Sequence, residues 1–160
     1  MTFRRLDQEE LNEMETEFVR FLAANTITGK DWEKLKKEQP EKAEGLIGIF
    51  SDIVFEKILK KVEYLEIKSR SEIRTFHCGQ DKIKMIGMRI QGESQLDFTK
   101  NQSPEQMLSL LKLSNARLQM YQGEKAYTRE REIELFEMME KQGALISKDG
   151  NLYKTLEQLK

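Results

Sequence analysis

The chain has 160 residues, which suits one domain with a hydrophobic core, and 38% of its residues are hydrophobic while 34% are charged. A formal net charge of −1 gives no overall attraction to nucleic acid or to an anionic membrane. The single cysteine excludes an internal disulfide and a multi-cysteine zinc site, and it indicates a reducing compartment.

Two helices are expected near the start. Residues 7–10 (Asp-Gln-Glu-Glu) have the pattern of a capping box. The apolar stripe that follows predicts an amphipathic helix ending near Asn25. A second, short helix is expected to begin at residues 28–31 and to contain Trp32 and Leu35.

The most apolar segment, residues 40–62, predicts a long central helix around which the core is built. Pro40 suits its first position, where the missing N–H has no partner to lose. Phe55 and Leu59 widen the apolar stripe of this helix, so we expect other parts of the chain to pack on more than one of its sides. The stripe recurs at three- and four-residue steps: Ala43, Leu46, Ile47, Phe50, Ile53, Val54, Ile58 and Val62.

After this helix the apolar period becomes that of a strand. Three segments alternate apolar and polar residues: 64–68, 73–78 and 82–90. The pattern slips near residues 86–87, which predicts a bulge, and residues 79–81 suit a hairpin turn. The connections are too short for crossover helices, so we expect antiparallel pairing. A further short strand is expected at residues 96–99.

The last third of the chain mixes helices with one more strand. Ser103 and Pro104 open a helix with good capping chemistry. Residues 115–127 alternate again and predict a strand with an irregularity at its glycine. Another helix is expected from residue 128 until Gly143 ends it, and the last from 152 to 159.

These elements predict an α+β fold in which helices at both ends flank a small, mostly antiparallel sheet, with the long central helix at about residues 40–62. We expect a single domain over residues 1–160. Residues 1–62 would be helical, 63–100 would form the sheet, and 101–160 would be mixed.

Positive charge concentrates in the middle of the chain, where residues 67–129 hold 11 basic and six acidic side chains. Many lie in the sheet region: Lys68, Arg70, Arg74, Lys82, Lys84 and Arg89. They could form a surface for RNA, nucleotide phosphate or an acidic protein partner. They could also complement the chain's own acidic helices. We favour the second interpretation, because few aromatic side chains are interleaved with them.

No established catalytic or phosphate-binding motif is present. A single histidine excludes the His-Glu-x-x-His zinc motif, and neither a Gly-rich phosphate loop nor a Gly-x-Ser-x-Gly elbow occurs. His77 and Cys78 are adjacent, but neighbours on a strand point to opposite faces. We therefore interpret Cys78 as a buried structural thiol and His77 as a surface imidazole.

Carboxylates recur along one edge of the central helix, at Asp52, Glu56 and Glu63. Such a cluster can bind a divalent cation or share a proton. Lys60 would neutralise this edge, so we favour a solvated or salt-bridged face. Asp52 lies in the most apolar part of the helix, where it must reach water or find a partner such as Arg74 or Arg89.

Residues 49–66 read Ile-Phe-Ser-Asp-Ile-Val-Phe-Glu-Lys-Ile-Leu-Lys-Lys-Val-Glu-Tyr-Leu-Glu. This run resembles the signature of a family of small, uncharacterised bacterial proteins. Residues 3–6, 17–22 and 142–156 are similar too, so the resemblance covers most of the chain. It implies a stand-alone, single-domain intracellular bacterial protein with no assigned activity. The residues that the resemblance would carry over are Ser51, Asp52, Glu56, Tyr64 and Glu66.

We favour a non-enzymatic cytoplasmic interaction protein that binds another protein or itself, because catalytic motifs are absent and amphipathic helices present apolar side chains such as Phe136, Met138 and Met139. The alternatives are RNA or nucleotide-phosphate binding through the basic sheet region, and a small metal-dependent hydrolase using Asp52 and Glu56. We expect no cofactor, and nucleic acid is the less favoured partner. No apolar run approaches the roughly 20 residues of a membrane span. The candidate binding residues are Asp52, Glu56, Tyr64, Glu66, Arg74, Lys82, Lys84 and Arg89.

Overall fold

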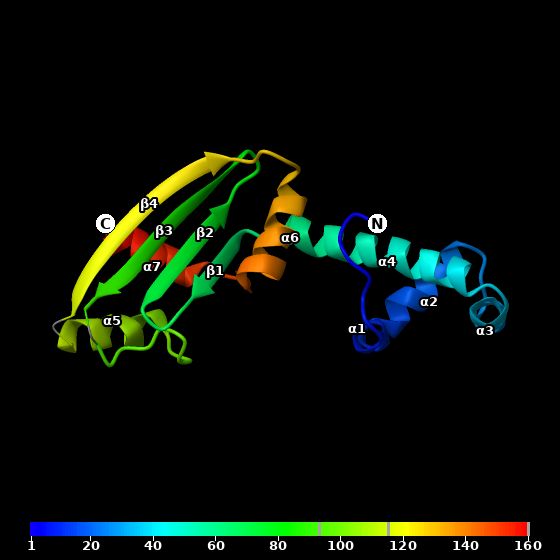
Figure 1. Cartoon of the computed structure of the whole chain (residues 1–160), viewed down its shortest axis with the longest axis horizontal. Coiled ribbons are helices and arrows are strands. Elements are labelled where there is room, and N and C mark those ends of the chain that lie inside the picture. The colour runs from blue at the N-terminus through cyan, green and yellow to red at the C-terminus, as the bar shows by residue number, and fades with distance from the viewer. Residues whose placement is uncertain (93, 115, 160) are drawn as a thin grey trace. The chain divides into compact units, whose positions relative to one another are not determined.

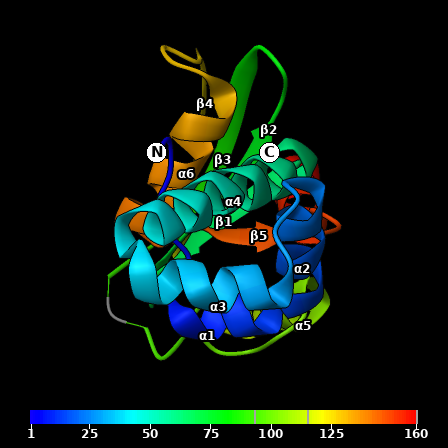
Figure 2. The ribbon, with the colours of Figure 1, turned by 90° about the vertical axis from the view of Figure 1, so that its right-hand side faces the viewer.

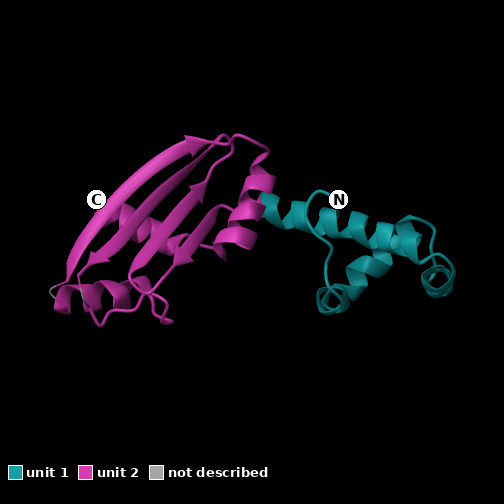
Figure 3. Ribbon diagram, in the orientation of Figure 1, with its two compact units in different colours: residues 1–60 teal, residues 61–160 magenta. Residues whose placement is uncertain are grey.

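A computed structural model describes residues 1–92, 94–114 and 116–159. Figure 1 shows the ribbon, and Figure 3 shows that the chain divides into two compact units, residues 1–60 and 61–160. Each unit is described by itself. The prediction of a single domain over residues 1–160 stays a prediction.

The first unit is helical. It contains α1 (Gln8–Glu13), α2 (Glu15–Ala24), α3 (Gly29–Glu38) and α4 (Pro40–Lys61), whose last residue begins the second unit. Both α1 and α3 start with complete capping boxes, as their sequences predict. The single helix expected up to Asn25 is wrong, because Met14 leaves helical geometry between α1 and α2. Both short helices can then bury apolar residues in one core.

Aromatic side chains form the centre of this unit. The ring of Phe18 lies 5.2 Å from Trp32 and 5.0 Å from Phe50, and Phe21 lies 5.4 Å from Phe50. The long central helix is confirmed, and Ala43, Ile47, Phe50 and Val54 are buried as predicted. Two of the predicted core positions are wrong, because Ile53 is 49% exposed and Ile58 is 42% exposed. The isoleucines of α4 occur around more of the helix than its neighbours cover.

The second unit contains a five-stranded sheet in the order β4-β3-β2-β1-β5, and each neighbouring pair is antiparallel. The strands are β1 (Tyr64–Lys68), β2 (Glu72–Cys78), β3 (Lys82–Gln91), β4 (Arg117–Ala126) and β5 (Leu145–Ser147). Four of them were expected, as were the antiparallel pairing of β1, β2 and β3 and the turn at residues 79–81. The sequence does not reveal β5, because three residues are too few to establish an alternation.

Three predictions about the sheet are wrong. The register of β3 advances one residue at a time through Ile86 and Gly87 against both neighbours, so no bulge occurs there. The pairing of β4 is equally regular at Gly123, where an irregularity was expected. Residues 96–99 are not a strand, although Phe98 is buried. Phe98 is a core side chain that lies in a loop, and its place in the sequence gave residues 96–99 the apparent alternation of a strand.

Helices cover the sheet unequally. Two of them, α5 (Pro104–Leu113) and α7 (Asn151–Leu159), pack on one face, and their side chains form a buried cluster with those of β2 and β3: Ile73, Ile86, Met88, Ile90, Met107, Leu111, Leu152 and Leu156. The third, α6 (Arg131–Gln142), lies where β2 ends (Figure 1; Figure 2). Gly143 ends α6 with a φ of 71°, as predicted. The fold is therefore α+β, with helices at both ends and the long α4 in the middle.

Candidate functional site

Asp52 holds the N-terminal segment on α4. Its carboxylate accepts the N–H of Thr2 at 2.7 Å and of Phe3 at 2.9 Å. The neighbouring Ser51 is 0% exposed, and its Oγ accepts the N–H of Leu6 at 2.9 Å while donating to the carbonyl of Ile47. The sequence predicts that Asp52 reaches water or finds a partner such as Arg74 or Arg89, and the partners it finds are backbone amides of its own unit rather than an arginine.

Glu56 lies on the solvent side of α4 and pairs with Lys60 at 3.2 Å, as the salt-bridged interpretation predicts. Both carboxylate oxygens of Asp52 already accept hydrogen bonds, so the two residues do not share a free set of ligand atoms. Within the described residues, no group of three or more His, Cys, Asp or Glu side chains is placed to hold a metal ion. Nothing in this geometry supports a catalytic role for the pair.

Tyr64 belongs to an aromatic cluster on the α7 side of the sheet. Its ring lies 5.0 Å from His77 and 5.6 Å from Tyr153 of α7. His77 is thus half-buried among aromatic rings, and the interpretation of it as a surface imidazole is wrong. Glu66, two residues further along the same face, pairs with Lys68 at 3.5 Å. These contacts give the cluster a packing role.

Cys78 is buried, as expected for a structural thiol. Burial raises the pKa of its thiol to about 12, against the weaker opposing effect of the nearby Arg131. The thiolate is therefore nearly absent at neutral pH, and a nucleophilic role would require the thiolate.

The strand register separates the predicted basic residues onto two faces. Directly opposed residues of an antiparallel pair share a face. Lys84 lies opposite His77 and so shares the α7 side, as does Lys82 two residues away. Arg74 lies opposite Gly87, and Arg89 two residues further lies on that same, opposite face. The basic sheet region is consequently not one surface.

Tyr121 forms the centre of the face that carries Arg74 and Arg89. It lies opposite Gly87, and a Cβ on Gly87 would come within 2.2 Å of the Tyr121 Cζ atom. The absence of a side chain at Gly87 therefore allows the ring to lie on the sheet. The guanidinium carbon of Arg89 lies 5.6 Å from the ring centroid, and Arg89 pairs with Glu72 at 2.7 Å.

Local electrostatics fix the protonation states of this group. Burial, reinforced by the nearby Glu72 carboxylate, raises the pKa of Tyr121 to about 12. The pKa of Glu72 is lowered although its partial burial opposes this, because Tyr121, Arg89 and Arg74 favour the carboxylate. At neutral pH the phenol is neutral and Glu72 is ionised. The Tyr121 hydroxyl is buried beside Glu72.

We name this surface the open face. It consists of Glu72, Arg74, Arg89, Arg117, Gln119, Tyr121 and Lys125, which share one side of the sheet by register. The helices α5 and α7 pack on the other side. Arg89, Arg117, Gln119 and Lys125 are exposed. Four cations and one anion make the open face strongly basic, although the whole chain is nearly neutral.

Sequence reasoning missed the contribution of β4 to this surface. The alternation at residues 115–127 already places Arg117, Gln119 and Tyr121 on one side of a strand. What was lacking was the pairing of β4 with β3, which brings Tyr121 onto Gly87 and beside Arg89.

Arg131 is a second residue that sequence reasoning missed. It is buried at the start of α6, and its guanidinium donates to the carbonyls of Gly79 at 3.0 Å, Cys78 at 3.1 Å and Val62. From the sequence, a basic residue in the first turn of a helix is expected to be exposed to solvent. Nothing in the neighbouring residues indicates that Arg131 is buried. It ties α6 to the ends of two other segments.

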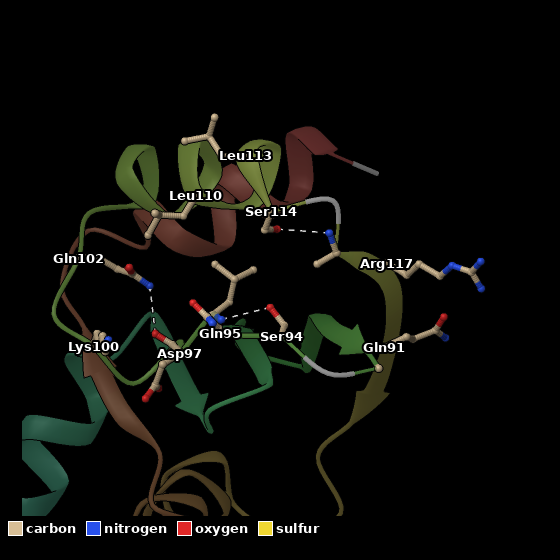
Figure 4. Close-up of a pocket in the computed structure, with 13 residues that line it drawn as sticks. Gln91, Ser94, Gln95, Asp97, Lys100, Gln102, Leu110, Leu113, Ser114 and Arg117 are labelled. Atoms are coloured by element: carbon tan, nitrogen blue, oxygen red, sulfur yellow. Dashed lines mark hydrogen bonds between the residues drawn. The ribbon is translucent and has the colours of Figure 1, made fainter.

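A cavity of about 930 Å³ lies between α5, residues 94–102 and the ends of β3 and β4 (Figure 4). Several of its polar groups are used locally: Ser94 Oγ accepts the N–H of Leu96, and Gln102 donates to the carbonyl of Asp97. Figure 4 shows the side chains of Arg117 and Leu113 directed away from its centre. Among the described lining residues no serine hydroxyl donates to a carboxylate, since Ser94 accepts from Leu96 and Ser114 donates to the carbonyl of Leu111, so we assign no reaction to the cavity.

Three further sequence expectations concern α6. The sequence predicts exposed side chains at Phe136, Met138 and Met139, but each is only partly accessible. They therefore do not form the apolar surface on which the interaction hypothesis partly rested. Exposed apolar side chains occur elsewhere in the second unit, at Leu110, Leu113 and Leu118 among others.

Comparison with known families gives one result that covers the whole chain. The model of DUF6495, described as a family of unknown function, matches residues 1–160. Comparisons with curated proteins and with solved structures gave no significant match. Among the described residues, no helix is both long and apolar enough to cross a membrane. The resemblance to a family of uncharacterised proteins is thus confirmed, whereas the bacterial origin and the role of the run at residues 49–66 stay predictions.

Proposed function

This chain belongs to the family of unknown function DUF6495, and we propose that it is a non-enzymatic interaction protein that binds an acidic surface of a protein partner through the open face of its sheet. One observation carries the proposal. Arg74 of β2 and Arg89 of β3 lie beside Tyr121, and Arg117 lies further along β4 on the same side of the sheet, away from α5 and α7.

The chemistry of this group suits recognition. Arginine and tyrosine are enriched where proteins bind one another, since each combines apolar area with hydrogen-bonding atoms. Tyr121 is held against Gly87, and Arg89 is oriented by Glu72, so little side-chain freedom is lost on binding. An excess of positive charge favours carboxylates and speeds their approach.

The same face could attract RNA, and a protein partner is better supported. Single-stranded nucleic acid is bound by several aromatic platforms in a row, whereas Tyr121 is the aromatic side chain of the open face. Lys82 and Lys84, which the RNA alternative requires, lie on the other side of the sheet.

The proposal includes a cytoplasmic setting and a bacterial source. The lone, buried Cys78 supports a reducing compartment, in which such a thiol stays free. Tyr64, Glu66, Lys82 and Lys84 are not part of the proposed surface, and neither are Asp52 and Glu56 of the first unit. Of the candidate residues in the sequence, Arg74 and Arg89 remain.

The test compares charge removal on the two faces of the sheet. Fluorescence anisotropy would measure binding of a labelled polyglutamate peptide and of a labelled polyuridylate RNA. We expect the peptide to bind, and R89Q/R117Q to weaken it about tenfold, equivalent to about 1.4 kcal/mol. The matched control K82Q/K84Q removes the same charge from the opposite face and should change binding less than twofold.

Three results would contradict the proposal. Equal losses of peptide affinity in R89Q/R117Q and K82Q/K84Q would mean that binding depends only on the net charge of the protein and not on the open face. Binding of the RNA without the peptide would favour the nucleic-acid alternative. Binding of neither probe would remove the open face as a recognition surface.

A further inference from the structure

The strand β4 (Arg117–Ala126) forms one edge of the sheet. It pairs with β3 over ten consecutive residue pairs, and no other described strand pairs with it. An antiparallel strand alternates the direction of its amide and carbonyl groups, so half of those in β4 point away from β3. This edge therefore presents a row of donors and acceptors that suits one more strand.

Two features that commonly protect a sheet edge, proline and a bulge, do not occur along β4, although Arg117, Glu124 and Lys125 are charged. At ten residues β4 is as long as β3, whereas the opposite edge strand, β5, has three. A long regular edge of this kind is what proteins that add a partner strand use.

The side chains of β4 define what such a strand should carry. On the side of the open face an added strand would run beside Arg117, Gln119, Tyr121 and Lys125. On the α5 side it would run beside Leu118, which is 40% exposed, and the half-buried Met120. Acidic side chains suit the first side and apolar side chains suit the second.

Charge disfavours a second copy of this chain as the added strand. Two β4 strands related by a two-fold axis through Tyr121 would place Arg117 of one copy directly opposite Lys125 of the other. Like charges opposite each other in a sheet are destabilising. Other two-fold registers that keep the sheet continuous also join the two open faces side by side, so basic surface meets basic surface.

We propose that β4 accepts an extended segment of a partner protein as an added strand, and that this segment alternates acidic residues on the open face with apolar residues on the α5 side. Backbone hydrogen bonds to β4 supply affinity, and the alternation supplies selectivity. The inference rests on the proposed function for the acidic character of the partner. It adds the edge of β4 as the docking element.

The probe is a labelled eight-residue peptide that alternates Glu and Val, used with the whole chain. Two derivatives carry N-methyl groups, one on every Glu nitrogen and the other on every Val nitrogen. In an extended strand one of these sets faces β4 and the other faces solvent. Both derivatives retain the charge and composition of the parent peptide.

We expect one N-methylated peptide to bind at least tenfold more weakly than the parent and the other to bind within about threefold. Hydrogen exchange followed by NMR should show that the parent peptide slows exchange of alternate β4 amides, those that point away from β3. A peptide with the same composition in blocks, four Glu and then four Val, should bind more weakly than the parent.

The docking inference is overturned if both N-methylated peptides bind like the parent and β4 exchange is unchanged. If R89Q/R117Q still weakens polyglutamate binding in that case, the open face remains the recognition surface. Absence of any binding by the alternating peptide also overturns the inference. Slowing of β4 exchange that grows with protein concentration, without peptide, would show that a second copy occupies the edge.

Discussion

Arg131 offers the sharpest test of how the second unit is held together. We consider Arg131→Leu, which keeps much of the apolar bulk and removes every donor. The carbonyls of Val62, Cys78 and Gly79 then lose a charged donor in a buried region. All three carbonyls lose Arg131, but Tyr127 still donates to that of Gly79. The carbonyls of Val62 and Cys78 are therefore the two that lose a donor without this substitute.

The expected size follows from those two groups. A hydrogen bond from a charged donor contributes about 1.5–3 kcal/mol, and an unsatisfied buried acceptor costs about 1–3 kcal/mol. Removing the cost of burying the guanidinium itself offsets part of this loss. We expect a net destabilisation of about 3–4 kcal/mol, within the range known for broken buried networks.

The assay is urea unfolding with two probes. Trp32 is the single tryptophan and reports on the first unit, whereas the reactivity of Cys78 reports on the second. Arg131→Leu should lower the urea midpoint seen by Cys78. The control Arg129→Leu removes an exposed arginine paired with Glu137 and should change stability by less than about 1 kcal/mol. Equal midpoints for the two variants would refute the reasoning.

Three further predictions concern single groups. Ser51→Ala should destabilise the first unit by about 1–2 kcal/mol in urea unfolding followed by Trp32 fluorescence, because the N–H of Leu6 loses its buried acceptor; an unchanged midpoint would show that water replaces the hydroxyl. Because burial raises the pKa of Cys78 to about 12, a thiol reagent at mildly alkaline pH should modify it only as fast as the protein opens, and labelling as fast as that of a free thiol would contradict this burial. The hydrogen bond from Arg4, helped by the N–H of Asp7, lowers the pKa of Glu10 from 4.5 to about 2, so the stability it contributes is present above pH 4.5 and is lost as pH falls towards 2. Glu10→Gln should flatten that part of the stability profile, and identical acid profiles for both proteins would contradict the assignment.

Much of the secondary structure follows from short stretches of sequence. The capping boxes at Asp7 and Thr28 start helices, and Gly143 ends one, because each signal involves residues within a few positions of one another. Alternation likewise predicts β1 to β4, and short connections predict the antiparallel pairing of β1, β2 and β3. The α+β class could therefore be predicted from the sequence.

Local patterns also produced the errors. Ile53 and Ile58 satisfy the helical period of α4 and yet are exposed, because the period shows which residues share a face and not how many faces are covered. The slip at residues 86–87 reflected Gly87, whose missing side chain makes room for Tyr121 from β4. In sequence the two positions are too far apart for any local pattern to connect them.

The sequence alone determined where helices and strands form, because those choices depend on nearby residues. Tertiary structure decided what the functional groups do. Strand register, a long-range pairing, put Arg74 and Arg89 on one face and Lys82 and Lys84 on the other. Asp52 binds the N-terminal segment, and Arg131 is buried against Cys78. In both cases the partners are about fifty residues apart in the sequence. A charged side chain has the same local pattern whether it is solvated or buried, so only the partners brought to it by the fold determine its role.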